Sequence, residues 1–547
     1  MQKKYYFTYF VIVPFAHDEM TTTPCREHVY CSSLAVLGTG SDVGKSTIAA
    51  GICRILTNHG LSIAPFKGQN MSNNSRPALL PHGKGYGEIG IAQAIQAEAC
   101  RILPRVEMNP VLLKSGGRRP TDGAYLCSVL VLGQLLATED YGQLKERTQT
   151  LMTLVLNAHQ QLYQATKAQV IVLEGAGSCT ELNLMDRDIV NLPLVRKLNC
   201  PWLLVANIDP GGVFAQIVGT KACLPDNDWD MCVGIVINKL RGDVKYFEPG
   251  PTMLREMVGK PVFVVPYLNK LHIAEEDGMG VERRLNGEKY KTSTTTNNTI
   301  PTVVVVAYPH VAMTEDLLPL ESDHRYHLDW RRDTKPMYPP DAIILPGSRQ
   351  TRSDMEWLVH TGWDTYIKDF VKNGGRILGI CGGYQMMGME ITDETGVENG
   401  PVGTTLGLGI FAIRTTLEPT EVKVVRPQSA TLLTGDGCDD IQLEGYEVHC
   451  GKSSPINDDA SPPLIQLPNG QEDGSTQNGC VHGCYLHCML RSKAARDFLL
   501  LGHGHTYEFN DCKCDTIDEQ DPLDRLANHL ESCGLNFETL TRMLDIM

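Results

Sequence analysis

Short, continuous apolar runs recur along residues 33–270 and alternate with segments whose apolar residues have helical spacing. Apolar runs without polar alternation are typical of strands buried on both faces of a parallel sheet. Strands that alternate with helices in this way indicate an α/β sheet. The pattern predicts strands at residues 34–37, 170–173, 202–206, 233–237 and 262–265.

A second α/β pattern follows the polar stretch at residues 292–299, which has nothing apolar to bury and is typical of a linker. Residues 455–478 are rich in Pro, Asp and Gly and predict a surface loop. Residues 524–546 have the apolar spacing of one closing helix. The strands of this part are expected at residues 302–307, 342–345 and 376–379.

The chain of 547 residues is too long for a single hydrophobic core. The apolar run at residues 5–16 follows two lysines but lacks a clear cleavage site. Three interpretations of the N-terminus stay open: a non-native extension with the true start at Met20, a targeting segment, or folded structure. The predicted organisation is an extension, a first domain, a linker and a second domain, at residues 1–32, 33–270, 271–300 and 301–547.

Composition narrows the class of protein. The net charge of −15 argues against non-specific binding to nucleic acid or to an anionic membrane surface. No apolar stretch reaches the roughly 20 residues that a membrane helix needs. The 18 cysteines are scattered rather than framed, which indicates reduced thiols and a cytoplasmic protein.

A glycine-rich segment, Gly-Thr-Gly-Ser-Asp-Val-Gly-Lys-Ser at residues 38–46, directly follows the first predicted strand. Such a turn directs backbone N–H groups and a helix dipole at phosphates. Lys45 would bind the terminal phosphates, and Ser46 would offer its hydroxyl to Mg²⁺. The segment resembles the variant phosphate loop of dethiobiotin-synthetase-like ATPases. The predicted ATP-binding residues are Thr39, Gly40, Ser41, Asp42, Val43, Gly44, Lys45, Ser46 and Thr47.

Carboxylates after the strand at residues 170–173 are candidate metal ligands. Glu174 ends this strand, and an acid at the carboxyl end of a parallel strand is well placed to bind Mg²⁺. Asp186 and Asp188 follow, for which a solvated charged turn is the alternative interpretation. We predict Ser46 and Glu174 as metal ligands, and a substrate or metal role for Asp186 or Asp188.

A second motif places Cys381 between a predicted strand and a helical pattern, with Gly382 and Gly383 directly after it. A strand–turn–helix crowds the backbone, so glycines are needed beside a nucleophile on such a turn. The turn also directs N–H groups at an oxyanion, and the helix N-terminus favours a thiolate. The pattern indicates a cysteine nucleophile rather than a buried structural cysteine.

A thiolate nucleophile requires a base. His487 is the first candidate and His449 the second. The N–H groups of Gly347 and Gly382 would form the oxyanion hole. Zinc binding is the disfavoured alternative, because paired Cys-x-x-Cys spacing is missing from the cluster of Cys480, His482, Cys484, His487 and Cys488.

Together these motifs make the chain resemble the cobyric acid synthases, the glutamine-hydrolysing amidases of cobalamin biosynthesis, from residue 33 onward. No single matching block is specific, but their combination is. The blocks are residues 65–74, 88–94, 108–114, 174–191, 211–215 and 237–243 in the first domain, and 345–348, 377–385, 445–451 and 485–487 in the second.

The resemblance implies a P-loop, dethiobiotin-synthetase-like parallel-sheet domain followed by a class I glutamine amidotransferase-like α/β domain. The first would use ATP and Mg²⁺ to phosphorylate a corrinoid carboxylate, and ammonia would attack the acyl phosphate. In the second, Cys381 would attack glutamine and His487 would transfer the proton. The implied products are amides at carboxylates b, d, e and g of adenosylcobyrinic acid a,c-diamide.

The resemblance further implies a corrinoid and glutamine as partners, with no nucleic acid and no membrane, and leaves the oligomeric state open. Members of this family lack the usual triad carboxylate after the histidine, and here Cys488 follows His487 in place of the family's glycine. Asn207 and Pro210 stand where the family has Asp and Arg, and residues 115–117 read Ser-Gly-Gly in place of Pro-Gln-Gly. Because the phosphate-loop lysine and both glutaminase residues are intact, we expect an active enzyme.

Two other functions fit the same motifs. One is cobyrinic acid a,c-diamide synthase, or another amidase with the same domain pair, although the block at residues 65–74 favours the cobyric acid branch. The other is a partner-binding P-loop regulator with a decayed glutaminase domain, against which the intact Cys381 and His487 argue.

Overall fold

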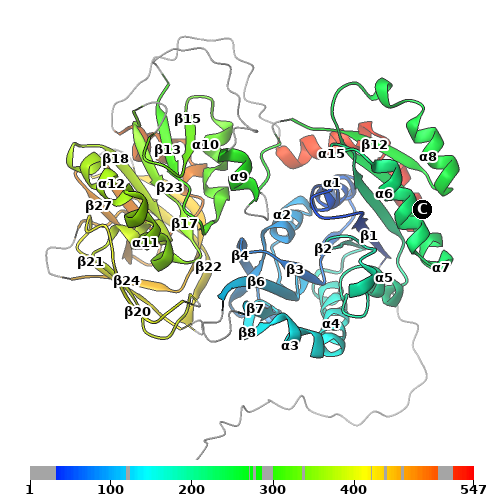
Figure 1. Cartoon of the computed structure of the whole chain (residues 1–547), viewed down its shortest axis with the longest axis horizontal. Coiled ribbons are helices and arrows are strands. Elements are labelled where there is room, and N and C mark those ends of the chain that lie inside the picture. The colour runs from blue at the N-terminus through cyan, green and yellow to red at the C-terminus, as the bar shows by residue number, and fades with distance from the viewer. Residues whose placement is uncertain are drawn as a thin grey trace, which may run out of the picture.

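The computed structural model describes residues 32–546 with internal gaps, and these residues form two lobes (Figure 1). The predicted extension, apart from Ser32, and the polar stretch at residues 292–299 lie outside the described residues. The residues left out are 1–31, 119–123, 270, 275–278, 286–299, 336–338, 399, 420–421, 436–439, 457–460, 503–520 and 547.

The first lobe is built on six parallel strands in the order β12–β11–β10–β1–β9–β2. All five strands predicted from apolar runs are confirmed. The sixth, β2, is short and contains Pro65, so its sequence carries only a weak strand signal. The strands are β1 (Ser32–Gly38), β2 (Ile63–Phe66), β9 (Val170–Glu174), β10 (Trp202–Asn207), β11 (Cys232–Leu240) and β12 (Val262–Pro266).

Helices cover both faces of this sheet and enclose two apolar cores. Among the described helices, none is both long and apolar enough to cross a membrane. The helices of this lobe are α1 (Lys45–Asn58), α2 (Ile91–Ala99), α3 (Tyr141–Glu146), α4 (Thr148–Thr166), α5 (Leu192–Leu198), α6 (Val213–Cys223), α7 (Asp226–Asp230) and α8 (Gly250–Val258).

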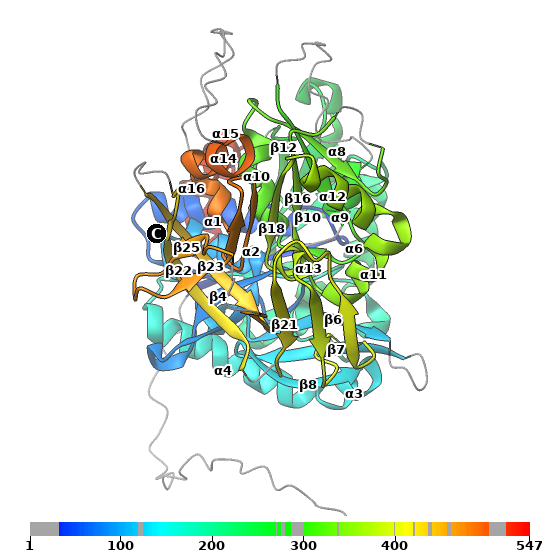
Figure 2. The same cartoon turned by 90° about the vertical axis from the view of Figure 1, so that its left-hand side faces the viewer.

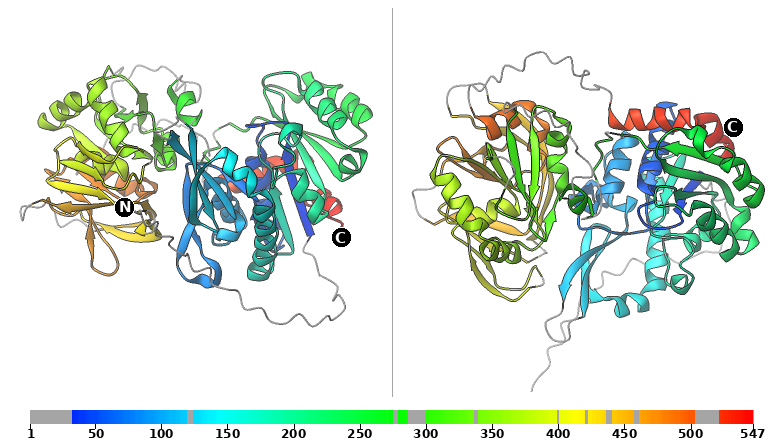
Figure 3. Two further views of the ribbon diagram at one scale, coloured as in Figure 1. Left: turned by 60° about the horizontal axis from the view of Figure 1, so that its bottom comes forward. Right: turned by 45° about the horizontal axis from the view of Figure 1, so that its top comes forward.

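Two smaller β structures extend from the first lobe (Figure 3). One is the sheet β3–β6–β7–β8, and the other is the hairpin of β4 and β5, which contacts strands of the second lobe. Their strands are β3 (Gln69–Met71), β4 (Ser75–Leu79), β5 (Tyr86–Gly90), β6 (Val111–Arg118), β7 (Tyr125–Val131) and β8 (Gln134–Asp140).

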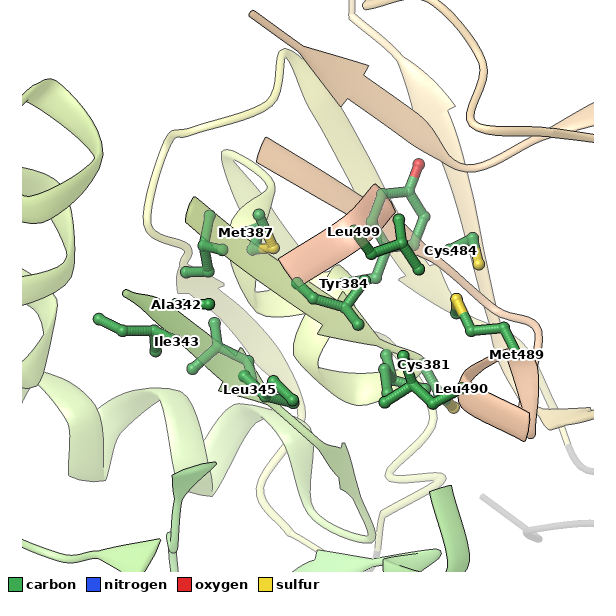
Figure 4. Close-up of a cluster of buried hydrophobic side chains, with 14 of the residues drawn as sticks. Ala342, Ile343, Leu345, Cys381, Tyr384, Met387, Cys484, Met489, Leu490 and Leu499 are labelled. Carbon is green, nitrogen blue, oxygen red and sulfur yellow. The ribbon is translucent and has the colours of Figure 1, made fainter. Parts of the chain in front are cut away.

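The second lobe contains a six-stranded sheet in the order β15–β13–β16–β18–β28–β27, in which β27 alone runs antiparallel to its neighbour. The three strands predicted here are confirmed. Figure 4 shows part of the apolar core, with Cys381 beside Tyr384 and Leu490. The strands are β13 (Thr302–Val306), β15 (His327–Arg331), β16 (Ala342–Leu345), β18 (Arg376–Ile380), β27 (Ser475–Gln477) and β28 (Val481–Cys484).

The second lobe and the segment leading to it also contain six helices among the described residues. The helix that follows β18 is α13, and its first turn holds the cysteine motif. The helices are α9 (Met279–Leu285), α10 (Leu318–Ser322), α11 (Thr351–Thr361), α12 (Trp363–Lys372), α13 (Gly382–Met387) and α14 (Lys493–Leu501).

Two further sheets, β20–β19–β21–β24 and β23–β22–β25–β26, and the pair β14–β17 belong to the second lobe (Figure 2). The loop predicted at residues 455–478 is partly wrong, because β25, β26 and β27 lie within it. These strands have two or three residues and are too short to show a periodic pattern. The bounds are β14 (Val311–Ala312), β17 (Gly347–Ser348), β19 (Glu390–Asp393), β20 (Gly403–Leu406), β21 (Ile413–Leu417), β22 (Val424–Leu432), β23 (Ile441–His449), β24 (Gly451–Pro455), β25 (Ile465–Gln466) and β26 (Glu472–Asp473).

The end of the chain returns to the first lobe. The single closing helix predicted at residues 524–546 is two helices, α15 (Pro522–Ser532) and α16 (Phe537–Leu544), separated near Gly534 with φ 89°. Leu530 of α15 packs so closely on α1 that a Cβ on Gly51 would lie 2.3 Å from its Cδ1. Figure 1 shows α15, in red, beside α1. This packing differs from the predicted division in which residues 301–547 form one domain.

Candidate functional site

The glycine-rich segment forms the loop between β1 and α1. Gly44 has φ 100°, and a Cβ there would lie 2.1 Å from Nδ2 of Asn238, so only glycine fits. Lys45 Nζ donates hydrogen bonds to the carbonyl oxygens of Gly40 (2.7 Å) and Gly177 (2.9 Å). The loop borders a cavity of about 1260 Å³, whose wall includes Ser41, Asp42, Gly44, Lys45, Ser46 and Thr47 of the predicted ATP-binding residues.

The other three predicted residues, Thr39, Gly40 and Val43, make hydrogen bonds that hold the loop in place. Thr39 Oγ1 donates to Oε1 of Gln216 at 3.1 Å, and the carbonyl oxygen of Val43 accepts from Asn238 Nδ2 at 2.9 Å. Gly40 is the residue whose carbonyl oxygen receives Lys45. The helix that begins at Lys45 therefore has its N-terminus at the cavity, where its dipole favours anions.

Glu174 lies at the end of β9 and is buried beside the phosphate loop. Its Oε1 accepts hydrogen bonds from Ser46 Oγ and from Lys67 Nζ, both at 2.7 Å. Its Oε2 accepts from the side-chain amides of Gln93 (3.1 Å) and Gln96 (2.6 Å). Burial alone would raise the pKa of Glu174, but the positive charge of Lys67 lowers it, so the carboxylate is ionised.

Lys67 was not among the predicted site residues. It also lines the cavity, and it faces Glu174 from the end of β2. The sequence signal was its position in the block at residues 65–74, directly after an apolar run.

Asp186 and Asp188 do not line this cavity. Asp186 is largely exposed, with Oδ1 3.7 Å from Nε of Arg187. Asp188 accepts hydrogen bonds from the N–H groups of Val190 and Asn191, both at 2.7 Å. Asp188 thus stabilises the turn that leads into α5. These contacts favour the alternative interpretation, in which the two aspartates belong to a charged turn.

Asn207, at the end of β10, lines the same cavity. Its Oδ1 accepts a hydrogen bond from the N–H of Asp209 at 2.9 Å. Asp209 in turn pairs with Arg241, whose Nε lies 2.6 Å from Oδ1. Although Pro210 occupies the family's arginine position, the guanidinium of Arg241 stands at this part of the wall.

Cys381 lies at the sharp turn between β18 and α13, with φ 52° and ψ −106°. A positive φ is unusual for a residue with a side chain, and such strain gathers at functional turns. The next two positions must be glycine, because a Cβ on Gly383 would lie 1.9 Å from the carbonyl oxygen of Leu345 and one on Gly382 would lie 2.7 Å from the nitrogen of Ser348. The backbone therefore has the geometry expected of a nucleophile turn.

His487 is fully buried, and its Nδ1 lies 2.8 Å from Oδ2 of Asp316. The other oxygen of Asp316 accepts a hydrogen bond from the N–H of Cys488 at 2.6 Å. Burial would lower the pKa of His487, but Asp316 and, to a smaller extent, Cys381 raise it well above its ordinary value. Among the described residues, Nε2 of His487 has no hydrogen-bond partner.

Asp316 is, after Lys67, a second candidate site residue that the sequence did not reveal. It is 171 residues before His487, in the 3₁₀ turn Thr314–Leu317, so no local spacing connects the two. The carboxylate missing after the histidine is thus supplied by a distant segment. Cys488 has φ 67°, which is the conformation that favours the family's glycine at this position.

Gly347 belongs to β17 and faces the same space. A Cβ on Gly347 would lie 3.6 Å from Cε1 of His487, while Gly382 touches the neighbouring Ser348. Cys381, His487 and Gly347 line one cavity of about 510 Å³.

His449, the second candidate base, lines this cavity too. Its Nδ1 lies 2.8 Å from the carbonyl oxygen of Gly451, and its ring stacks on Tyr485 with centroids 3.9 Å apart. Cys381 is among the groups that raise the pKa of His487, so the thiol lies near this ring. His487 is therefore the stronger candidate for the base. Across the part of the chain that the structure describes, no group of three or more His, Cys, Asp or Glu is arranged to hold a metal ion.

Known protein families match both halves of the chain. Residues 34–281 match the CobQ/CobB/MinD/ParA nucleotide binding domain, and residues 302–495 match the CobB/CobQ-like glutamine amidotransferase domain. The cobyric acid synthase of Chlorobium phaeobacteroides (strain BS1) is 36% identical over 516 residues, covering 91% of this chain and 97% of its own. That of Chlorobium chlorochromatii (strain CaD3) is 37% identical over 94% of this chain and 97% of its own. The chain belongs to the cobyric acid synthase family.

One solved structure, titled as a glutamine amidotransferase, aligns with 37% of this chain and 98% of its own at 17% identity and a TM-score of 0.27.

Within this family member, the smaller cavity spans the two lobes. Its wall holds Cys381 and His487 on one side and Ser75, Glu88 and Lys114 of the first lobe on the other. Glu88 pairs with Lys114 and also with Lys423 of the second lobe, whose Nζ lies 2.7 Å from Oε1. Burial lowers the pKa of Lys114 to about 7, although the negative charge of Glu88 acts to raise it.

Proposed function

We propose that this protein is a glutamine-hydrolysing, ATP-dependent amidoligase. It converts the b, d, e and g carboxylates of adenosylcobyrinic acid a,c-diamide into amides, giving adenosylcobyric acid. The observation that carries the proposal is the identity of 36–37% to cobyric acid synthases over nine-tenths or more of both chains. The turn at Cys381, opposite the first lobe, supports it independently.

In the glutaminase half, the Cys381 thiolate attacks the amide carbon of glutamine. The N–H groups of Gly347 and Gly382 stabilise the resulting oxyanion. His487 gives a proton to the departing nitrogen, so ammonia leaves and a thioester remains. Water, deprotonated by His487, then hydrolyses the thioester to glutamate and restores the thiolate.

Asp316 orients His487 for these transfers. Its hydrogen bond to Nδ1 directs Nε2 away from the carboxylate, and Nε2 is the atom left without a partner among the described residues. The raised pKa of His487 favours the protonated ring that the leaving nitrogen requires.

In the amidoligase half, the phosphate loop and Lys45 hold ATP while a corrinoid carboxylate attacks the γ-phosphorus and ADP leaves. Ammonia then attacks the acyl phosphate, and inorganic phosphate leaves. Lys67, held against Glu174, adds positive charge at this site. Ser46 and Glu174 would hold Mg²⁺, because hydroxyl and carboxylate oxygens are its usual ligands, and the ion would neutralise phosphate charge when bound.

The direct test is mass spectrometry of the purified protein with ATP, glutamine and either adenosylcobyrinic acid a,c-diamide or cobyrinic acid. We expect four successive carboxylate-to-amide mass steps on the a,c-diamide. Two steps on cobyrinic acid, with no reaction of the a,c-diamide, would assign the a,c-diamide synthase instead. Absence of glutaminase activity altogether would favour a P-loop regulator.

A further inference from the structure

An ion pair between the two lobes involves Glu315, the residue directly before Asp316, whose carboxylate holds His487. Arg76, in β4 of the first lobe, donates from Nε to both oxygens of Glu315, at 2.9 Å and 3.2 Å. The Glu315 side chain is 1% exposed and that of Arg76 is 14% exposed. The other cation near Glu315, Arg491, is largely exposed and lies farther away, with Nη2 3.9 Å from Oε2. Removing Arg76 would therefore leave the buried carboxylate without its close partner, which is costly.

Glu315 is also linked to His487 through Tyr446. The hydroxyl of Tyr446 donates to Glu315, and its ring stacks on His487 with centroids 5.1 Å apart at 23°. The N–H of His487 donates to the carbonyl oxygen of Tyr446 at 2.9 Å. Glu315 is therefore linked to His487 both through the adjacent Asp316 and through Tyr446.

A second contact from the same segment of the first lobe holds this turn. Asn74 Oδ1 accepts a hydrogen bond from the N–H of Met313 at 3.0 Å. Met313 has φ 56°, a conformation that a side chain makes costly and that tertiary contacts must maintain. The turn that carries Asp316 is thus fixed at two points by the other lobe.

The segment that makes these contacts begins at the nucleotide cavity. Lys67 pairs with Glu174 beside the phosphate loop, and Arg76 lies nine positions further along the chain. One short segment therefore touches both sites, which gives the first lobe a physical connection to the glutaminase base.

We propose that Arg76 is a positioning residue for the glutaminase: by holding Glu315, it fixes Asp316 and Tyr446 around His487, so that the glutaminase site is complete only when the first lobe is docked. The inference rests on the proposed role of His487 as the base. Arg76 is not among the residues that line the cavity of Cys381; it acts through Glu315.

The test compares Arg76→Ala, Arg76→Lys and Glu315→Gln in the full chain, measuring glutamate release and, separately, amidation with ammonium chloride. We expect Arg76→Ala to lower kcat for glutamine at least tenfold with an unchanged KM, and to leave ammonia-dependent amidation within twofold. Arg76→Lys should recover part of kcat. Glu98→Ala, which removes only the outer 3.4 Å contact of Arg76, is the matched control and should behave as wild type.

Unchanged kcat for glutamine in both Arg76→Ala and Glu315→Gln would overturn the inference while leaving the proposed function intact. Wild-type protein without glutaminase activity would instead overturn the proposed function itself. If Arg76→Ala fails to fold, Glu315→Gln decides, because it removes the charge but keeps the shape and the hydrogen bond with Tyr446. An equal loss of glutamine-dependent and ammonia-dependent activity in Glu315→Gln and Arg76→Lys would show a merely structural role and also overturn the inference.

Discussion

At the scale of single residues, the proposed mechanism depends on the pair of His487 and Asp316. A buried imidazole without a carboxylate would lose its proton, because burial disfavours the charged form. Asp316 reverses that preference and raises the pKa of His487. The protonated ring can therefore donate to the nitrogen that leaves glutamine.

Replacement of Asp316 by Asn removes the main group that raises the pKa of His487. Since His487 must be protonated to release ammonia, the alkaline limb of the glutaminase pH profile follows this pKa and should move to lower pH. We expect kcat to fall by about 10²-fold or more, the usual contribution of a positioned acid or base. The pH dependence of glutamate release by the Asp316→Asn variant measures both effects.

The control is Asp497→Asn, which removes a carboxylate of the same lobe that pairs with Arg325. It should leave the profile unchanged. An alkaline limb of Asp316→Asn that coincides with the wild-type limb would show that this carboxylate does not act on the base.

A second residue-scale prediction concerns His159 in α4, which contacts Ser33 Oγ at 3.4 Å and packs edge-on against Phe66. Burial lowers the pKa of His159 to about 4. The unfolded chain, with a histidine pKa near 6.5, binds more protons below that pH, so the stability of the first lobe should fall as pH drops from 6.5 towards 4.

The expected contribution of His159 is about 2 kcal/mol of lost stability between pH 7.5 and pH 5. His159→Gln should remove this part of the pH dependence, measured by urea unfolding at the two pH values. His59→Gln, at a position whose side chain is 44% exposed, serves as the control. Equal pH dependence in wild type and His159→Gln would contradict the argument.

At the scale of elements, the last two helices connect the end of the chain to its nucleotide-binding lobe. Helix α15 lies on α1, the helix that begins at Lys45. Gly51 permits this close approach, because any Cβ there would meet Leu530. The C-terminal segment therefore supports the helix whose N-terminus faces the nucleotide cavity.

Leu530→Ala should lower the stability of the first lobe by about 2–5 kcal/mol, the usual cost of a large-to-small change in a packed core. Leu530 is fully buried, whereas Leu103 of the same lobe is 70% exposed. Thermal unfolding of Leu530→Ala and of Leu103→Ala measures the difference. Similar melting temperatures for the two variants would show that α15 contributes little to the lobe.

At the scale of the whole molecule, the sequence predicted the two α/β sheets, because strands buried on both faces form unbroken apolar runs. It also predicted the turns at Lys45 and Cys381, where backbone geometry demands glycines. It could not predict contacts between distant segments, since neither the bond of His487 to Asp316 nor the packing of α15 on α1 leaves a local pattern. The strands β25, β26 and β27 were missed because strands of two or three residues are too short to show a periodic pattern.

The arrangement of the lobes gives the central claim its physical basis. Cys381 and His487 share a cavity with Ser75, Glu88 and Lys114 of the nucleotide-binding lobe. In the proposed mechanism, ammonia would be released at Cys381 beside the domain that would use it. Hydrolysis of glutamine and amidation of the corrinoid should therefore be separable by one substitution at the cysteine.

The most direct measurement is amidation of adenosylcobyrinic acid a,c-diamide by Cys381→Ala, with glutamine in one reaction and ammonium chloride in the other. The account predicts no amidation with glutamine and four amidations with ammonium chloride at a rate close to that of wild type. Amidation by the variant with glutamine, or its failure with ammonium chloride despite a folded protein, would contradict the account.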